Sequence, residues 1–395
     1  MIIDLMIEYL FWLLLPVAAA SGWFAARSSF KKQQSGTGSD CPQKGYFKGL
    51  NYILNEQPDK AIEVFVEMVQ VDSETVETHL ALGNLFRKRG EVDRAIRIHQ
   101  NLIARPTLNV SQRAHALVEL GQDYMSAGLL DRAENIFCEL VENSRYKALA
   151  LRYLKDIYQS EKEWDNAIKV LRRMSDLPRT VRNKTIAQYY CELAEQARET
   201  GDVPLVKRHL KQAIGVDPQC ARASMLQGEL EWESGNVKNA LRCYERFISQ
   251  SPELSDEVIE RVYDCHQQLN SVKKFLADLR RLPEAAVGPV TRRVGLRLHS
   301  NTDDEKSYRD AIYAALEDHP SLSLTENWLE LLSESKEIDS PAELHKLLSV
   351  ITRLADEDEG YRCQHCGYVA KSLHWLCPSC KHWDSTIPIN AIGNP

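Results

Sequence analysis

The sequence lacks an excess of positive charge, and this limits the partners it can attract. Its 395 residues include 49 Lys and Arg against 56 Asp and Glu, which gives a formal net charge of -7. No global basic field therefore exists to collect the phosphates of a nucleic acid. Hydrophobic residues make up 44% of the chain and charged residues 27%, so the composition excludes a disordered protein and allows a large buried core.

The sequence also lacks the signatures of common enzyme classes. It contains no phosphate-binding nucleotide loop, no nucleophile elbow and no HExxH motif. We therefore expect a protein that works by binding, without catalysis of its own.

Closely spaced cysteines are absent from most of the chain, which excludes the disulfide scaffold of a small secreted protein. Six cysteines stand singly in sequence of helical character. We interpret them as small buried hydrophobes in a reducing compartment, and pairing among some of them is the open alternative. They are Cys41, Cys138, Cys191, Cys220, Cys243 and Cys265.

One uncharged run, YLFWLLLPVAAASGWFAA from Tyr9 to Ala26, stands near the N-terminus. At about 1.5 Å per residue, its eighteen residues are just long enough to span the hydrocarbon of a bilayer. Arg27, Lys31 and Lys32 follow it, and basic residues remain on the cytoplasmic side. The run predicts a single-pass membrane anchor over residues 1–27, a polar linker over 28–44 and a cytoplasmic body. A cleaved secretory signal is the alternative, but it would need a basic segment before the apolar run.

The middle of the chain repeats itself. Segments beginning at Gly49, Gly83 and Gly121 each place an aromatic residue three positions on, Ala twelve on, and Phe or His sixteen on. The intervals between them, 34 and 38 residues, are typical of a helix-turn-helix repeat. Small residues let the paired helices approach closely, and stacked pairs bury a continuous core. We predict helical repeats over residues 45–354, clear over 45–253 and degenerate over 254–354.

The first helix of each pair should line the concave side of such a solenoid, where a protein partner would bind. A regular array of Lys, Asn and Arg able to clamp a terminal carboxylate is missing there. The predicted groove residues form a mixed polar and apolar set, and a solvated face is the alternative for each. They are Asn84, Arg87, Met125, Arg152, Asp156, Arg198 and Trp232.

The C-terminal stretch CQHCGYVAKSLHWLCPSC contains two CxxC knuckles separated by ten residues. Cys363, Cys366, Cys377 and Cys380 have the spacing that closes tetrahedrally around one metal ion, zinc or iron. A piece of about 35 residues has too small a core to fold alone, so metal binding should fold it. Two disulfides or four free thiols are the alternatives. Four thiolates fill the tetrahedron, which leaves His365, His374 and His382 as surface residues.

Four aromatic residues accompany the knuckles: Tyr361, Tyr368, Trp375 and Trp383. They would form either a small core around the metal or a docking face against the repeats, and the sequence leaves both open.

Several motifs together resemble a known family. Gly49/Tyr52/Ala61/Phe65 and Gly121/Tyr124/Ala133/Phe137 match the tetratricopeptide repeat. The segments LLLPVAAASGW, GNLFRKRGEVDRAIRIHQ, DYMSAGLLDRAE, YYCELA and YRCQHCGYVAKSLHWLCPSCKHW, in this order, resemble the lipopolysaccharide assembly protein B family of Gram-negative bacteria. The resemblance implies an all-α tetratricopeptide solenoid with an N-terminal transmembrane helix and, over 355–395, a small rubredoxin-like metal ribbon packed against the repeats.

The resemblance also implies a function. The family acts as an inner-membrane adaptor that brings the deacetylase committing material to lipid A synthesis (LpxC) to a membrane AAA+ protease (FtsH). Degradation of the deacetylase then limits lipopolysaccharide output. A membrane-tethered redox protein with rubredoxin-like iron, or a general scaffold for envelope assembly enzymes, are the alternatives. Nucleic acid is not an expected partner, and a homo-oligomer stays open.

Overall fold

A computed structural model describes residues 42–55, 57–71, 76–279 and 360–389, and single residues or pairs at 281, 288, 290–291, 294–295, 298, 325 and 329. The predicted anchor, most of the predicted linker and most of the degenerate repeat region lie outside these residues. Among the residues described, no helix is both long enough and apolar enough to cross a membrane. The chain divides into two compact units, residues 1–157 and 158–395.

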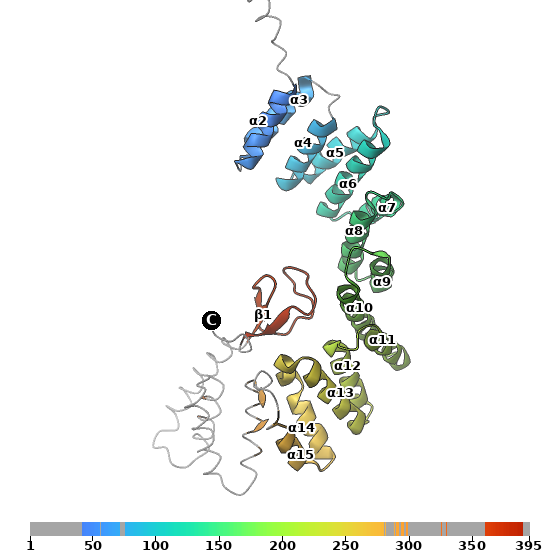
Figure 1. Ribbon diagram of the computed structural model, residues 1–395, viewed down its shortest axis with the longest axis vertical. Helices are drawn as coiled ribbons and strands as arrows, with labels where there is room; N and C mark the ends of the chain where they lie inside the picture. The colour runs from blue at the N-terminus through green and yellow to red at the C-terminus, as the bar shows by residue number, and fades with distance from the viewer. Residues whose placement is uncertain are drawn as a thin grey trace, which may run out of the picture. The chain divides into compact units, whose positions relative to one another are not determined.

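The first unit consists of paired antiparallel helices joined by short turns (Figure 1). Each pair buries apolar side chains in the face between its helices and against the next pair. The helices are α2 (Pro42–Leu54), α3 (Pro58–Val71), α4 (Val76–Lys88), α5 (Val92–Ile103), α6 (Val110–Ser126), α7 (Leu130–Leu140) and α8 (Lys147–Ser160), the last of which runs into the second unit.

The second unit continues the helical repeats and ends in a small sheet. Its helices are α9 (Trp164–Arg173), α10 (Arg179–Glu199), α11 (Val203–Val216), α12 (Ala221–Glu233), α13 (Val237–Gln250), the 3-10 turn η1 (Pro252–Glu257), α14 (Ile259–Gln268) and α15 (Val272–Leu279). Strands β1 (Tyr361–Cys363), β2 (Val369–Ala370) and β3 (Thr386–Pro388) form an antiparallel sheet in the order β2-β1-β3.

The glycines at the repeat signature positions do what the spacing predicts. A Cβ placed on Gly121 would lie 2.6 Å from the ring of Phe137, sixteen residues on, and a Cβ placed on Gly49 would lie equally close to the ring of Phe65. The missing side chain is therefore what lets the two helices of a pair meet. A fourth copy appears in the second unit, where a Cβ placed on Gly228 would lie 2.6 Å from the ring of Tyr244.

His99 occupies the ring position of the second repeat, packed against Gly83. It is fully buried, and its Nδ1 bonds the Asp123 carboxylate at 2.5 Å. The repeat thus accepts a polar ring in place of Phe where a neighbouring helix supplies a partner.

The turns inside the pairs depend on residues with positive φ. Gly90, Gly128, Gly201 and Gly235 all have positive φ and end the first helix of their pairs. In the pair α8–α9 the same place is taken by Lys162, with φ of 58°, so the turn forms there at the cost of a strained backbone.

The single cysteines divide into two groups. Cys191, Cys220, Cys243 and Cys265 are buried and unpaired, as predicted. The prediction is wrong for Cys138, which is exposed. It directly follows the buried Phe137, and one residue along a helix turns the side chain about 100° away from the core. Cys41 lies outside the described residues.

Candidate metal centre

The two CxxC knuckles meet, and their four sulfur atoms all lie within 4.8 Å of one another. The Sγ atoms of Cys363 and Cys380 are 3.7 Å apart, as are those of Cys366 and Cys377. Ligands held at about 2.3 Å in a tetrahedron around one ion are separated by about 3.8 Å. The sulfur positions therefore fit a single tetrahedral metal ion, and they fit zinc and iron equally well.

The backbone of each knuckle turns in the same way. Gly367 N–H donates to the carbonyl of Cys363, and Lys381 N–H donates to that of Cys377, both at 2.9 Å. Both residues directly follow the second cysteine of their knuckle and have positive φ, 76° and 57°. Gly367 adopts this turn without steric cost, while Lys381 adopts the same conformation against the preference of its side chain.

Hydrogen bonding prepares one sulfur for ionisation. Burial opposes a charge on Cys363, but the Ser385 hydroxyl, 3.3 Å from Sγ, and the backbone amides of Cys366 and His365 stabilise the thiolate. Together they bring the pKa of Cys363 down to about 6. Desolvation and the neighbouring sulfurs act in the opposite direction on Cys380 and raise its pKa to about 12. Cys363 and Cys380 therefore ionise over different pH ranges.

Two of the three nearby histidines lie beside the sulfur cluster, since the ligand atoms of His365, Cys380 and His382 are all within 4.8 Å of one another. His365 and His382 are exposed and stack on one another with ring centroids 3.6 Å apart, while His374 is half-buried. Their assignment as accessory surface residues agrees with these positions.

The ribbon lies against the helical repeats of its own unit, beside α8, α10 and α12 (Figure 1). Trp383 is central to this contact. Its ring meets those of Trp164 and Tyr189 edge-on, with centroids 6.3 and 5.8 Å away, and the guanidinium of Arg222 lies 5.8 Å from its centroid. Its Nε1–H donates to Gln159 Oε1 at 3.2 Å.

A polar network surrounds this aromatic contact. Gln188 on α10 donates to the Asp384 carboxylate at 2.7 Å, and Arg222 pairs with Glu192 and Glu195 at 2.8 and 2.6 Å. Burial raises the pKa of Asp384, although the bond from Gln188 works against that shift. Arg222 is only 3% exposed, and it joins the ribbon to α10 because its guanidinium lies over Trp383 and pairs with the two α10 carboxylates.

The other ribbon aromatics divide between the two roles that the sequence leaves open. Tyr361 and Trp375 pack against the core formed by α12, α13, α14 and α15, and the Tyr361 hydroxyl donates to Glu257. Tyr368 is 39% exposed. Three of the four aromatics thus form a docking face against the repeats.

The predicted groove residues differ in their contacts and in their exposure. Arg87 lies in an ion-pair network with Glu119 and Asp123 at 2.6 and 2.7 Å, and Arg198 binds Glu229 at 2.7 Å and also Glu233. Each of these pairs joins the first helices of neighbouring repeats. The ring of Trp232 packs against the core of the second unit, and Asn84, Met125, Arg152 and Asp156 are half-buried or exposed. Their role in partner binding stays a prediction.

Sequence reasoning missed the residues that seat the ribbon: Gln159, Gln188, Tyr189, Arg222, Asp384 and Ser385. One signal was present for the repeat-to-repeat ion pairs. A basic and an acidic residue about 31 to 36 positions apart, one repeat length, lie side by side on adjacent first helices. No such periodicity connects the ribbon to α8, because 224 residues separate Trp383 from Gln159.

Comparisons with known proteins agree with both parts of this architecture. The model of the rubredoxin metal binding domain matches residues 361–388, and tetratricopeptide repeat models match residues 78–113 and 191–254. Among solved structures, the C-terminal part of a repeat-containing protein from Cytophaga hutchinsonii covers 61% of this chain and 97% of its own, with 12% identity and a TM-score of 0.40.

Two curated relatives are similar along nearly their whole length. Lipopolysaccharide assembly protein B of Escherichia coli K12 is 37% identical over 98% of this chain and 99% of its own length. The protein of the same name from Haemophilus influenzae is 33% identical over the same shares. Similarity of this extent covers the repeats and the metal ribbon together, and the chain therefore belongs to the lipopolysaccharide assembly protein B family.

Proposed function

We propose that this chain is a non-enzymatic adaptor in lipopolysaccharide synthesis. The observation that carries the proposal is the similarity to lipopolysaccharide assembly protein B along 98% of the chain. In the finer form of the proposal, the chain sits on the inner membrane and presents the deacetylase that commits material to lipid A synthesis to a membrane AAA+ protease. Tetratricopeptide repeats support this role, because stacked helix pairs offer an extended surface to protein partners.

The docking of the ribbon on the helices also supports an adaptor. Trp383, Asp384 and Tyr361 hold the ribbon on the helices by side-chain contacts, so ribbon and repeats present one combined surface to a partner. Such a surface has a fixed shape before binding, which reduces the ordering cost of association.

We further propose that Cys363, Cys366, Cys377 and Cys380 bind one metal ion. The ion would tie the two knuckles together, and the chain's own Ser385 and knuckle amides would stabilise the thiolates around it. Metal analysis with an absorption spectrum separates the two candidates. An iron tetrathiolate is coloured and bleaches on reduction, which would favour the redox alternative, whereas zinc is colourless and unchanged by reductant.

The membrane part of the proposal concerns residues 1–27 as the anchor and 28–44 as the linker to a cytoplasmic body. It is tested by fractionating cells and treating spheroplasts with protease. A body that stays with the inner membrane and is cut only after lysis agrees with the proposal. A body found in the soluble fraction, or cut in intact spheroplasts, contradicts it.

The adaptor function is tested by depleting the chain in its host and following the deacetylase after translation is blocked. We expect the deacetylase to become long-lived and lipopolysaccharide to accumulate. Wild-type chain supplied in trans is the positive control, and Tyr368→Ala, a change at an exposed ribbon aromatic, is the matched variant expected to restore turnover. An unchanged deacetylase lifetime after depletion would contradict the adaptor proposal and leave the redox and general scaffold alternatives.

A further inference from the structure

The second helices of the repeats in the second unit carry an excess of positive charge. The second helices α9, α11 and α13 carry nine Lys and Arg against two acidic residues, and α11 has no acidic residue. Eight of the nine basic side chains are exposed and Arg246 is half-buried. They are Lys169, Arg172, Arg173, Lys207, Arg208, Lys211, Lys238, Arg242 and Arg246.

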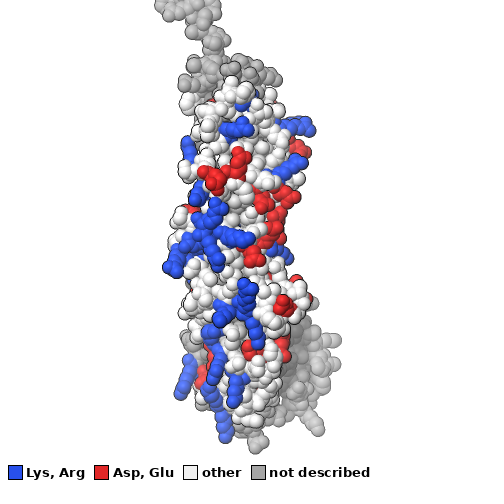
Figure 2. Space-filling model, turned by 90° about the vertical axis from the view of Figure 1, so that its right-hand side faces the viewer, with Lys and Arg blue, Asp and Glu red and all other residues white. Residues whose placement is uncertain are grey.

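The repeat fold does not require this charge. The corresponding second helices of the first unit, α3, α5 and α7, carry four basic against seven acidic residues, although they make the same helix pairs. In the space-filling view, Lys and Arg predominate in the lower part of the picture (Figure 2). The second helices of the two units therefore differ in the sign of their charge although they share one fold. This difference indicates that the basic helices bind a negatively charged ligand.

Most basic side chains of α11 and α13 form no ion pair with another described residue. Within the part of the chain that the structure describes, no ion pair involves Arg208, Lys211, Lys238 or Arg242. Other surface arginines, such as Arg198, are held by two carboxylates from the neighbouring repeat. These side chains can therefore pair with an external anion without first breaking an ion pair within the protein.

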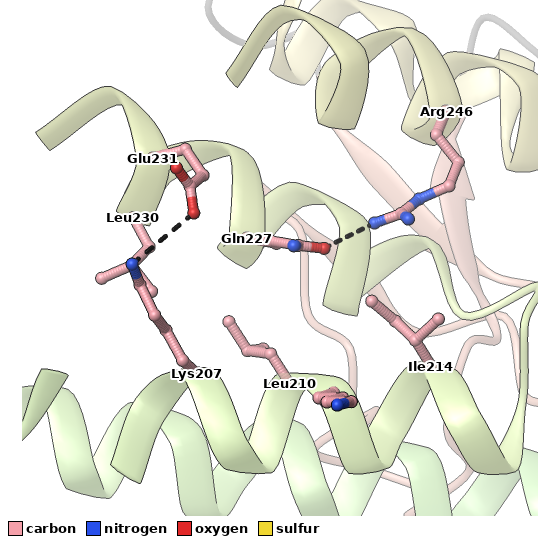
Figure 3. A pocket seen from close by; sticks show the side chains of 8 residues that line it. Lys207, Leu210, Ile214, Gln227, Leu230, Glu231 and Arg246 are labelled. Carbon is pink, nitrogen blue, oxygen red and sulfur yellow. Dashed lines mark hydrogen bonds and ion pairs between the residues drawn. The ribbon is translucent and has the colours of Figure 1, made fainter. Parts of the chain in front are cut away.

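A cleft opens in the middle of this face, between α11, α12 and α13 (Figure 3). Its volume is about 340 Å³. Leu210, Ile214 and Leu230 give it an apolar lining, and Lys207, Lys211 and Arg246 bring cations to it against the single carboxylate of Glu231.

The cations of the cleft are partly positioned in advance. Arg246 donates from Nε to Ser224 at 2.9 Å and from Nη2 to Gln227 at 2.8 Å, which fixes the plane of the guanidinium. Lys207 reaches Glu231 only at 3.8 Å, a loose pair that a stronger anion can replace. Arg246 is held in one orientation beside two exposed lysines, above an apolar lining. Such a site can bind the phosphate group of an amphiphilic molecule.

We propose that the basic face of α9, α11 and α13 binds the surface of a bilayer that contains anionic phospholipid, with one headgroup phosphate in the cleft. Its cations are spread over three successive helices, an arrangement that matches a plane of separated negative charges. An acidic peptide would need a continuous groove, whereas the cleft is confined to the junction of α11 with α12 and α13. Lysine and arginine near an anionic leaflet each strengthen binding by about fivefold, so nine together form a substantial contact.

The test uses the full chain reconstituted in vesicles of phosphatidylcholine alone, or with about one third phosphatidylglycerol. Acetylation of Lys207, Lys211 and Lys238 is measured by mass spectrometry, with Lys60 on α3 as the internal reference. We expect the three lysines to be acetylated at least about tenfold more slowly in the anionic vesicles, with Lys60 unchanged, and the protection to disappear in high salt.

Two charge variants make the test specific to the face. Arg208→Glu with Arg242→Glu leaves every lysine in place and should abolish the protection. Arg94→Glu with Arg97→Glu makes the same change of net charge on α5 of the first unit and should leave the protection intact. Because all four arginine side chains are exposed, folding should survive in both variants, and circular dichroism verifies this.

Four results would overturn the proposal. Equal acetylation in both lipid mixtures, or equal loss of protection in the two variants, would show that the face does not bind the bilayer. Protection of Lys207 and Lys211 by inorganic phosphate without lipid would make the cleft a phosphate site alone. Protection that requires an added acidic protein would assign the face to that protein. Association with neutral vesicles is scored separately, because it reports on the anchor and not on this face.

Discussion

Replacing Trp383 by Ala should release the ribbon from the repeats while leaving its metal site filled. The side chain makes two edge-to-face aromatic contacts, one cation–π contact and one hydrogen bond to Gln159. Such contacts are worth roughly 0.5–1.5 kcal/mol each, and they overlap, so a total of about 3 kcal/mol is expected. This matches the usual cost of about 3–5 kcal/mol for truncating a packed Trp or Phe.

A loss of about 3 kcal/mol corresponds to a shift of about 150-fold toward the undocked ribbon. Cys220 reports on this shift, because its buried thiol lies 3.8 Å from Gln188 Nε2, which also binds Asp384 of the ribbon. Alkylation of Cys220, followed by mass spectrometry, should become about a hundredfold faster in Trp383→Ala. The exposed Cys138 gives the reagent's intrinsic rate.

The matched control is Tyr368→Ala, which removes a ribbon aromatic that is 39% exposed and should leave the Cys220 rate unchanged. Metal content must stay at the wild-type level in both variants, because Trp383 supplies no sulfur ligand. If Cys220 in Trp383→Ala reacts at the wild-type rate while the metal is retained, the reasoning that this tryptophan holds the ribbon is refuted.

Three further predictions test the site and the fold. Cys366→Ser should lose the metal and unfold the ribbon but keep most repeat helix; a variant with full metal content would refute the ligand assignment. Gly121→Ala should destabilise the repeats by about 1–3 kcal/mol in thermal unfolding, because its Cβ would overlap Phe137. Gly215→Ala is the control, because open space surrounds that position, and it should stabilise the repeats by up to about 1 kcal/mol. Equal effects of the two substitutions would contradict the packing argument. Burial raises the pKa of Asp384, so its contribution to ribbon stability is present at low pH and is lost as pH rises through that pKa. Asp384→Asn should therefore reduce the fall in ribbon stability between about pH 4.5 and about pH 7, measured by guanidinium unfolding, and an unchanged fall would show that other groups cause it.

The repeats and the sulfur cluster were predictable because each depends on a short-range or periodic pattern. Gly121 and Phe137 are sixteen residues apart, and the same pair recurs one repeat earlier, so spacing alone indicates their contact. The two CxxC knuckles are likewise local, and four thiols so spaced have few ways to satisfy one another other than a shared metal.

The seat of the ribbon was not predictable in the same way. Trp383 is a surface residue of the ribbon taken alone, and only the geometry of distant helices makes Gln159, Trp164 and Tyr189 its neighbours. Arg87 and Arg198 show a second limit of considering one repeat at a time. A first-helix arginine looks available to a partner in a single repeat, but the next repeat places carboxylates beside it.

The distance in sequence between Trp383 and Gln159 has a consequence for biosynthesis. Translation at about 5–20 residues per second needs roughly 10–45 s to cover the 224 residues between them. During that interval α8, α9 and α10 can form their local contacts, but Trp164 and Tyr189 wait without the ring that later covers them. The last step of folding is therefore the arrival of the ribbon, and a nascent chain starved of metal would stay at the preceding stage with an aromatic surface open to chaperones and proteases.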